Sequence, residues 1–185
     1  MWKISSQVDG GWTDYVHQDT FQHELAGATE RLVIAPSADP LGVARALVQE
    51  LSSPVFLLWV LHTPRGGSRI GRYQSPPLQV TDADALLGRF AAFFEEDARS
   101  DIWVHSVAPA ATIVFERHNL IYAYGDLPRF TAELIRRGMQ KGKVHIPSPH
   151  AHNYHPDHDA SEREFAASQS WSITSLRSGD EQSLR

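Results

Sequence analysis

The pattern of apolar and polar positions predicts a chain in which strands and helices alternate at first and a β-meander follows. Residues 55–62 (VFLLWVLH) are apolar at every position except the last. A run without polar alternation is typical of a strand that is covered on both faces, and therefore of a central strand. Residues 31–35 predict a shorter apolar strand, and the weak alternation of residues 2–8 predicts an edge strand.

Further strands are predicted in the second half of the chain, at 102–107, 111–116, 120–124 and 143–146. The second and third of these are joined by a turn at residues 117–119, where Asn119 suits a positive backbone φ angle. Because such a meander is antiparallel, it excludes a purely parallel doubly wound sheet.

The first predicted helix shows both a start signal and an apolar stripe. Asp39 is placed as its N-cap and Pro40 at its first position, both of which favour helix initiation. Residues 41–51 then repeat apolar side chains at helical spacing. The predicted buried stripe is Leu41, Ala44, Leu47, Val48 and Leu51.

Three later helices are predicted from their caps. Thr81, paired with Asp84, begins a helix over 82–98. Asp126 begins a helix over 127–137, which Gly138 ends. A capping pattern at residues 159–162 begins a last helix over 161–168. The predicted stripe of the first of these helices is Leu86, Leu87, Phe90, Phe93 and Phe94.

These elements predict one α+β domain over residues 1–168. We expect a mixed or mostly antiparallel sheet of five to six strands with helices packed on its faces. Residues 169–185 are Ser-rich, and we expect them to form a disordered C-terminal tail.

Composition narrows the function classes. The 185 residues carry 22 acidic and 17 basic side chains, a formal net charge of -5, which disfavours a general nucleic-acid-binding protein. The chain has no cysteine, so disulfides, thiol nucleophiles and cysteine zinc sites are excluded. The longest apolar run, residues 55–61, is far shorter than the roughly 20 residues of a membrane span, and the first residues do not form a signal peptide. We therefore expect a soluble, cytoplasmic protein.

Histidine is concentrated in one segment, residues 145–159, which contains five of the ten histidines. Imidazole is the commonest metal ligand and titrates near neutral pH. An extended His-x-His segment presents both imidazoles on one side. The candidate ligands of a divalent metal such as zinc are His150, His152, His155 and His158.

Two other interpretations of this histidine-rich loop were weighed. Residues 150–155 (HAHNYH) resemble the His-x-His-x-Asp-His signature of metallo-β-lactamase-type hydrolases, but Tyr154 stands where that signature needs an acidic ligand, so we do not assign that family. The loop also contains Pro147, Pro149 and Pro156, which favour a purely structural role as a rigid connection into the last helix. A partner-contact surface is open as well.

A second candidate site lies in the long loop predicted at residues 63–80. Its glycines allow close backbone approach, and arginine binds carboxylate or phosphate through two parallel hydrogen bonds. The candidate anion ligands are Arg65, Arg69 and Arg72. The spacing does not fit a P-loop, because Arg72 and Tyr73 follow Gly71 where that motif has Lys and Ser or Thr.

Two functions remain open on the residues alone. The first is a non-catalytic cytoplasmic partner-binding domain (an accessory, regulatory or toxin-neutralising protein) that attracts a basic protein partner by charge, with homodimerisation through the edge strand open. The second is a small metal-assisted hydrolase or lyase that uses the loop 145–159 for a metal and the loop 65–72 for an anionic substrate. His62, His105 and His118 lie at predicted strand ends or turns and can approach the histidine-rich loop.

Overall fold

The computed structural model describes residues 2–182 and 184 and confirms the α+β class. Its main sheet is larger than predicted, with nine strands in the described part of the chain instead of five or six. They lie in the order β10–β3–β4–β9–β8–β7–β5–β6–β12. All neighbours are antiparallel except β10 and β3, which are parallel, so the sheet is mixed. The strands are β3 (Thr20–Ala26), β4 (Thr29–Ala35), β5 (Val55–Leu61), β6 (Gly71–Gln74), β7 (Ser100–Val107), β8 (Ala110–Phe115), β9 (Ile121–Tyr124), β10 (Gln140–Lys141) and β12 (Ser172–Thr174).

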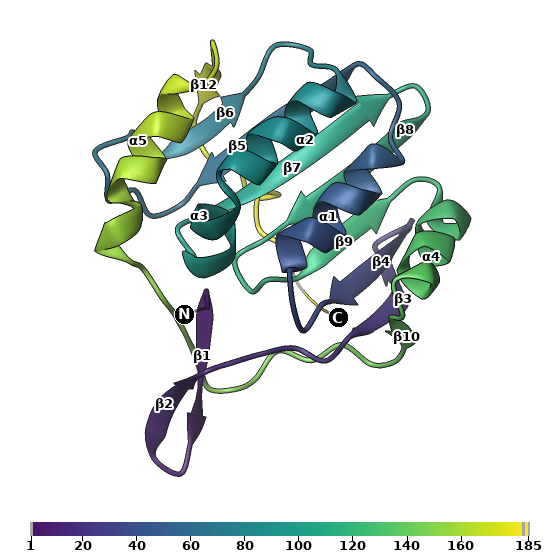
Figure 1. Cartoon of the computed structure of the whole chain (residues 1–185), viewed down its shortest axis with the longest axis vertical. Helices are drawn as coiled ribbons and strands as arrows, with labels where there is room; N and C mark the ends of the chain where they lie inside the picture. Colours follow the sequence, from purple (N-terminus) through teal and green to yellow (C-terminus); the bar gives the residue numbers. More distant parts are fainter. Residues whose placement is uncertain (1, 183, 185) are drawn as a thin grey trace.

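Helices cover one face of this sheet (Figure 1). Their apolar stripes meet the sheet in one large core, and all five stripe residues predicted for the first helix are buried. None of the described helices has the length and apolar character that crossing a membrane requires. The helices are α1 (Pro40–Gln49), α2 (Val80–Arg89), α3 (Ala91–Glu96), α4 (Leu127–Arg136) and α5 (Asp159–Ala167), with a 3-10 turn η1 (Pro156–His158) before the last.

Strand β5 is central, as its apolar run predicts, but it is not covered equally on its two faces. Trp59 points into the helix-covered core and contacts Phe165 of α5, with ring centroids 5.1 Å apart. Phe56 and Leu58 are only half-buried and line an open hollow of about 470 Å³ on the other face. The prediction of a strand that is covered on both faces was therefore correct for one face only.

Three of the strand and loop predictions were wrong, and they concern segments of the chain that are less apolar. The N-terminal strand β1 (Ile4–Val8) is not an edge strand, because it lies between β11 (His150–His152) and β2 (Gly11–Asp14) in a separate three-stranded sheet. No strand forms at 143–146, and the loop predicted over 63–80 contains β6. Short polar strands such as β11, which reads His-Ala-His, carry no apolar alternation and escape a periodicity argument.

Some of the predicted helix caps are confirmed and others are wrong. Asp39 and Asp126 accept hydrogen bonds from the N–H groups of Gly42 and Arg129, as N-caps do. Thr81 is not a cap, because α2 already begins at Val80, and the predicted single helix is divided at Phe90 into α2 and α3.

Two carboxylates predicted as cap partners are used elsewhere. Asp84 pairs with Arg45 of α1, with 2.7 Å between Oδ1 and Nε. Glu162 is buried within α5 and binds a neighbouring loop. In both cases, a tertiary partner outcompetes the local capping bond.

The Ser-rich C-terminal segment takes part in the fold. Strand β12 pairs antiparallel with β6, so it forms an edge of the main sheet. Beyond it, the buried carboxylate of Asp180 forms an ion pair with Arg72. The segment therefore runs back along the body of the domain (Figure 1).

A buried arginine joins the segments around the histidine-rich loop. Arg99 is fully buried, and its Nε and Nη1 atoms lie 2.8 Å and 2.7 Å from carboxylate oxygens of Asp97 and Glu162. Its Nη2 donates to the carbonyl of His155 at 3.0 Å, and Asp97 accepts from the N–H of the same residue at 2.7 Å. One guanidinium therefore fixes the start of β7, α5 and the end of the histidine-rich loop.

The charge of the buried Glu162 should make the stability of the fold sensitive to acid. Burial alone would raise the pKa of Glu162, but hydrogen bonds from three loop N–H groups and Arg99 outweigh it and lower the pKa to about 2. A lowered folded-state pKa stabilises the fold above the ordinary value near 4.5, and this contribution disappears as the pH falls to about 2. We expect Glu162→Gln to lose about 3 kcal/mol more at pH 6 than at pH 2, measured by urea unfolding.

The exposed Glu164 on the same helix is the matched control. Glu164→Gln should change the free energy of unfolding by less than about 0.5 kcal/mol at either pH. A cost of Glu162→Gln that is the same at pH 2 and pH 6 would contradict the proposed role of its charge.

Candidate metal centre

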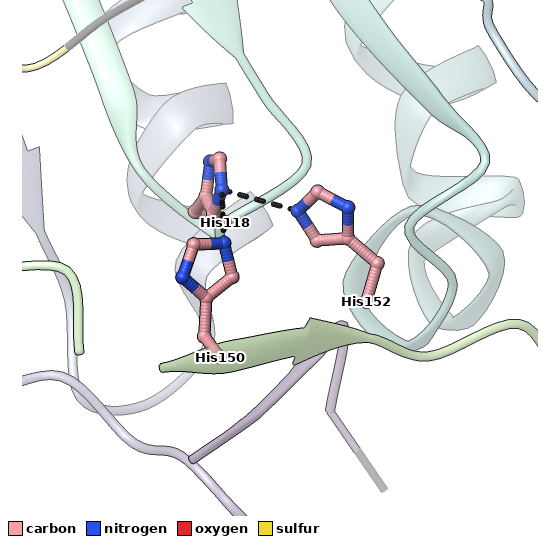
Figure 2. A group of neighbouring side chains, drawn as sticks. All are labelled: His118, His150 and His152. Carbon is pink, nitrogen blue, oxygen red and sulfur yellow. Dashed lines mark hydrogen bonds between the residues drawn. The ribbon is translucent and has the colours of Figure 1, made fainter. Parts of the chain in front are cut away.

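Three imidazoles from two distant chain segments converge at one end of the main sheet (Figure 2). His118 lies in the turn between β8 and β9, and His150 and His152 come from β11. The Nε2 atom of His118 lies 3.2 Å from Nε2 of His150 and 3.1 Å from Nε2 of His152. Two nitrogens bound to one tetrahedral zinc ion at 2.0–2.1 Å lie about 3.3 Å apart, which both of these distances match. All three ligand atoms lie within 4.8 Å of one another.

Strand geometry places the two histidines of β11 on the same side. Residues two apart in a strand share a face, and pairing with β1 fixes that face, with Ile4 opposite His152 and Ser6 opposite His150. The N–H of Asn153 extends this ladder by donating to the carbonyl of Lys3 at 2.7 Å. The third histidine is presented from the opposite side by a turn in which Asn119 has a φ of 58°.

Hydrogen bonds to the outer nitrogens determine which tautomers are present. His118 Nδ1 lies 2.7 Å from a carboxylate oxygen of Glu116, and His150 Nδ1 lies 2.9 Å from the carbonyl oxygen of Pro147. Both partners are acceptors, so both Nδ1 atoms must carry protons. In the neutral rings, the two Nε2 lone pairs then point at each other, which requires a proton or a cation between them.

The charges around the triad favour a cation at this point. Burial comes first among the causes that lower the pKa of His152 to about 4, followed by the charge of His118, so His152 is neutral at pH 7. Burial also opposes charge on His118, but the carboxylate of Glu116 outweighs it and raises the pKa of His118. The carboxylate of Glu116 therefore favours positive charge at the triad.

Glu116 holds His118 in place through two hydrogen bonds. Its buried carboxylate accepts from the backbone N–H of His118 at 2.9 Å as well as from its Nδ1, so both oxygens hold one residue. The buried Lys3 donates to the carbonyl of Glu116 at 3.0 Å and connects this turn to β1. A carboxylate behind a ligating histidine is the usual outer support of a zinc site.

The protein offers three ligands at this site. Among residues 2–182 and 184, the group contains only these three possible ligands, and His150 is exposed to solvent. Structural zinc sites have four protein ligands, whereas catalytic sites keep one position for water or substrate. Three is the number of ligands that a catalytic zinc site takes from the protein.

Two of the four histidines predicted as ligands lie outside the triad. His155 is held by its backbone groups, which bind Asp97 and Arg99. His158 Nε2 lies 3.0 Å from a carboxylate oxygen of Glu96. The sequence order does not show that His118 completes the site, because 32 residues separate it from His150.

The predicted anion-binding loop binds a carboxylate of its own chain. The N–H groups of Arg65, Gly66 and Ser68 all donate to Glu162, at 2.8–3.0 Å. Among the three predicted arginine side chains, Arg65 lies 3.7 Å from Asp159, Arg72 pairs with Asp180, and Arg69 is exposed. The structure therefore does not gather these arginines around one free anion site.

Comparison of the chain with protein-family models, with curated proteins and with solved structures finds no match.

Glu116→Gln tests the outer support of the triad. A carboxamide offers only one acceptor, so one of the two donors of His118 then faces an NH₂ group. We expect the zinc affinity to fall about 10- to 100-fold, measured by competition with a chelating dye. Glu96→Gln, which alters the His158 pair outside the triad, should leave zinc affinity unchanged. Equal affinities for the wild type and Glu116→Gln would show that Glu116 does not support the site.

Proposed function

We propose that this protein is a metal-assisted hydrolase in which His118, His150 and His152 bind a divalent ion. Zinc is the first candidate for this ion. The observation that carries the proposal is the convergence of three Nε2 atoms, two of them in rings whose Nδ1 atoms are committed to acceptors. Three neutral nitrogen ligands and an open position are the donor set of catalytic zinc.

Each part of the site has a chemical task under this proposal. A zinc ion held by these three histidines would lower the pKa of a bound water to about 7, which would make that water a nucleophile at neutral pH. His152, whose pKa is lowered to about 4, is free to bind metal without first losing a proton. Glu116 holds His118 in the tautomer that offers Nε2, and the Pro147 carbonyl does the same for His150.

Metal titration of the untagged, metal-free protein tests the proposal. We expect one zinc ion per chain, and we expect His118→Ala, His150→Ala or His152→Ala to weaken binding by at least about 100-fold, more than the loss of an outer partner does. His155→Ala and His158→Ala are matched controls from the same loop and should bind zinc like the wild type. At a zinc concentration of about 100 times Kd, the fold should gain about 2.7 kcal/mol.

Each alternative has its own outcome. If His155→Ala and His158→Ala weaken zinc binding as strongly as the triad variants, His155 and His158 take part in binding and the ligand set is not the proposed triad. If the wild type takes up no zinc, cobalt or nickel and gains no stability from them, the metal proposal is wrong.

The second candidate is the partner-binding domain, favoured by one observation. All four residues of β2 are exposed at the edge of the small sheet, and Trp12 is 53% exposed. In the ladder with β1, Ser6 bonds to Thr13, so the backbone N–H and C=O groups of Trp12 and Asp14 point outward. A free edge of this kind accepts an added strand. Failure of the metal titration would favour this candidate.

A further inference from the structure

A small hollow of about 140 Å³ lies between the segment that enters β3 and the segment that leaves β10. None of the described residues that line it carries a carboxylate. Drug-sized ligands need pockets of roughly 300–1,000 Å³, so this hollow suits a small ion or molecule. Its polar lining residues are Tyr15, His17, Gln18, Thr20, Lys143 and His145.

The segment that carries Lys143 and His145 is held firmly against β3. The N–H of Gly142 donates to a carbonyl oxygen of that strand at 3.0 Å. The N–H of the buried Val144 donates to the side chain of Gln22 at 2.8 Å. This wall of the hollow is therefore fixed by hydrogen bonds on both sides of Lys143.

His17 is the buried wall of the hollow, with only 5% of the residue exposed. Its Nε2 lies 2.7 Å from the carbonyl oxygen of His118, which can only accept, so Nε2 carries the proton. The ring of Tyr15 packs edge-on against it, with centroids 5.0 Å apart. Burial favours the neutral imidazole, so Nδ1 offers a lone pair, and it has no partner among the described residues. A donor from a bound molecule would satisfy this nitrogen.

The same hollow holds a cation and further donors that the described part of the chain does not use. The ammonium group of Lys143 has no hydrogen bond or ion pair with a described residue. The hydroxyl of Tyr15 and the ring of His145 are likewise without a partner there. The chain as a whole has a net charge of -5, so an unpaired lysine beside free donors and no carboxylate is a local exception that favours an anion.

We propose that this hollow binds a small oxyanion that keeps one O–H group, of the hydrogen phosphate class. Its charged oxygens accept hydrogen bonds from Lys143, Tyr15 and His145. Its O–H donates to Nδ1 of His17, which no fully deprotonated anion can do. The ion lies on residues outside the histidine triad, so this site does not depend on the proposed metal chemistry.

The test is isothermal titration calorimetry of the metal-free, full-length protein with inorganic phosphate and, separately, with sulfate. At pH 8 both are mainly dianions of similar size and shape, but only phosphate retains an O–H. The comparison therefore probes the Nδ1 of His17 without altering a buried residue. The titrations are made at about 0.15 M salt, where charges more than about 8 Å apart are largely screened.

Four variants are compared with the wild type. Lys143→Gln removes the cation, and Tyr15→Phe removes one hydroxyl while keeping the ring on His17. Lys141→Gln is the charge-matched control, because this exposed residue of β10 does not line the hollow. His150→Ala removes a triad histidine and controls for phosphate bound at the metal centre.

We expect one phosphate per chain and sulfate binding at least about tenfold weaker, because sulfate leaves the buried lone pair facing an oxygen. Lys143→Gln should raise the phosphate Kd about five- to tenfold, and Tyr15→Phe about two- to tenfold. Lys141→Gln and His150→Ala should match the wild type.

The inference is overturned if the wild type binds no phosphate, or if it binds sulfate as tightly as phosphate. A Kd that Lys143→Gln leaves unchanged, or that Lys141→Gln raises equally, also overturns it, because the ion would then not lie in this hollow. Loss of phosphate binding in His150→Ala would move the ion to the triad and contradict the inference as well. Failure of zinc binding alone leaves the inference unaffected.

Discussion

The buried side chain of Arg99 is the contact on which the site depends. Its guanidinium neutralises Asp97 and Glu162, two carboxylates with no solvent exposure, and through His155 it also fixes the backbone after β11. Removing one partner of such a buried pair typically costs 3–5 kcal/mol, because the remaining charge is left uncompensated. On the other side of Arg99, Glu162 binds the loop at residues 65–68 and closes it against α5. The path of the histidine-rich loop is therefore set by a charge network.

This anchor gives β11 a defined position over the turn that carries His118. The strand is held from three directions: by the ladder to β1, by Asn153, whose carbonyl accepts from Ala98 at 3.0 Å, and by His155 at the Arg99 network. Hydrogen bonds of Glu116 and Lys3 fix the turn that carries His118. Because both halves of the triad are supported by hydrogen bonds, the three imidazoles are held close together, which is the preorganisation that a metal site needs.

The parts of the fold that the sequence predicts well are those in which local chemistry decides. The fully apolar β5 is central, and Asp39 and Asp126 cap their helices through hydrogen bonds to N–H groups three residues further on. Glu162 shows the limit of such reasoning. Its spacing from Asp159 matches a capping box, yet Arg99 and the loop N–H groups bind its carboxylate more strongly. Likewise, the short β12 forms by pairing with β6, which itself pairs with β5.

The sequence predicts only part of the candidate site, because local spacing can be read from the sequence and tertiary contacts cannot. The His-x-His spacing of His150 and His152 is local, and it correctly places both rings on one face. His118 joins them only through tertiary contact, and the signals that mark it are the glutamate two residues before it and the αL residue Asn119 after it. His155 and His158 share the loop but not the geometry, because β11 ends before them and the 3-10 turn η1 directs them toward Asp97 and Glu96.

The most direct test of the central claim is X-ray absorption spectroscopy at the zinc edge of the protein loaded with one equivalent of zinc. We predict a first shell of three imidazole nitrogens at about 2.0–2.1 Å and one oxygen from water. Loss of one imidazole from that shell in His118→Ala would identify the turn histidine as a ligand. A wild-type shell with fewer than three imidazoles, or a shell that His118→Ala leaves unchanged, would contradict the account.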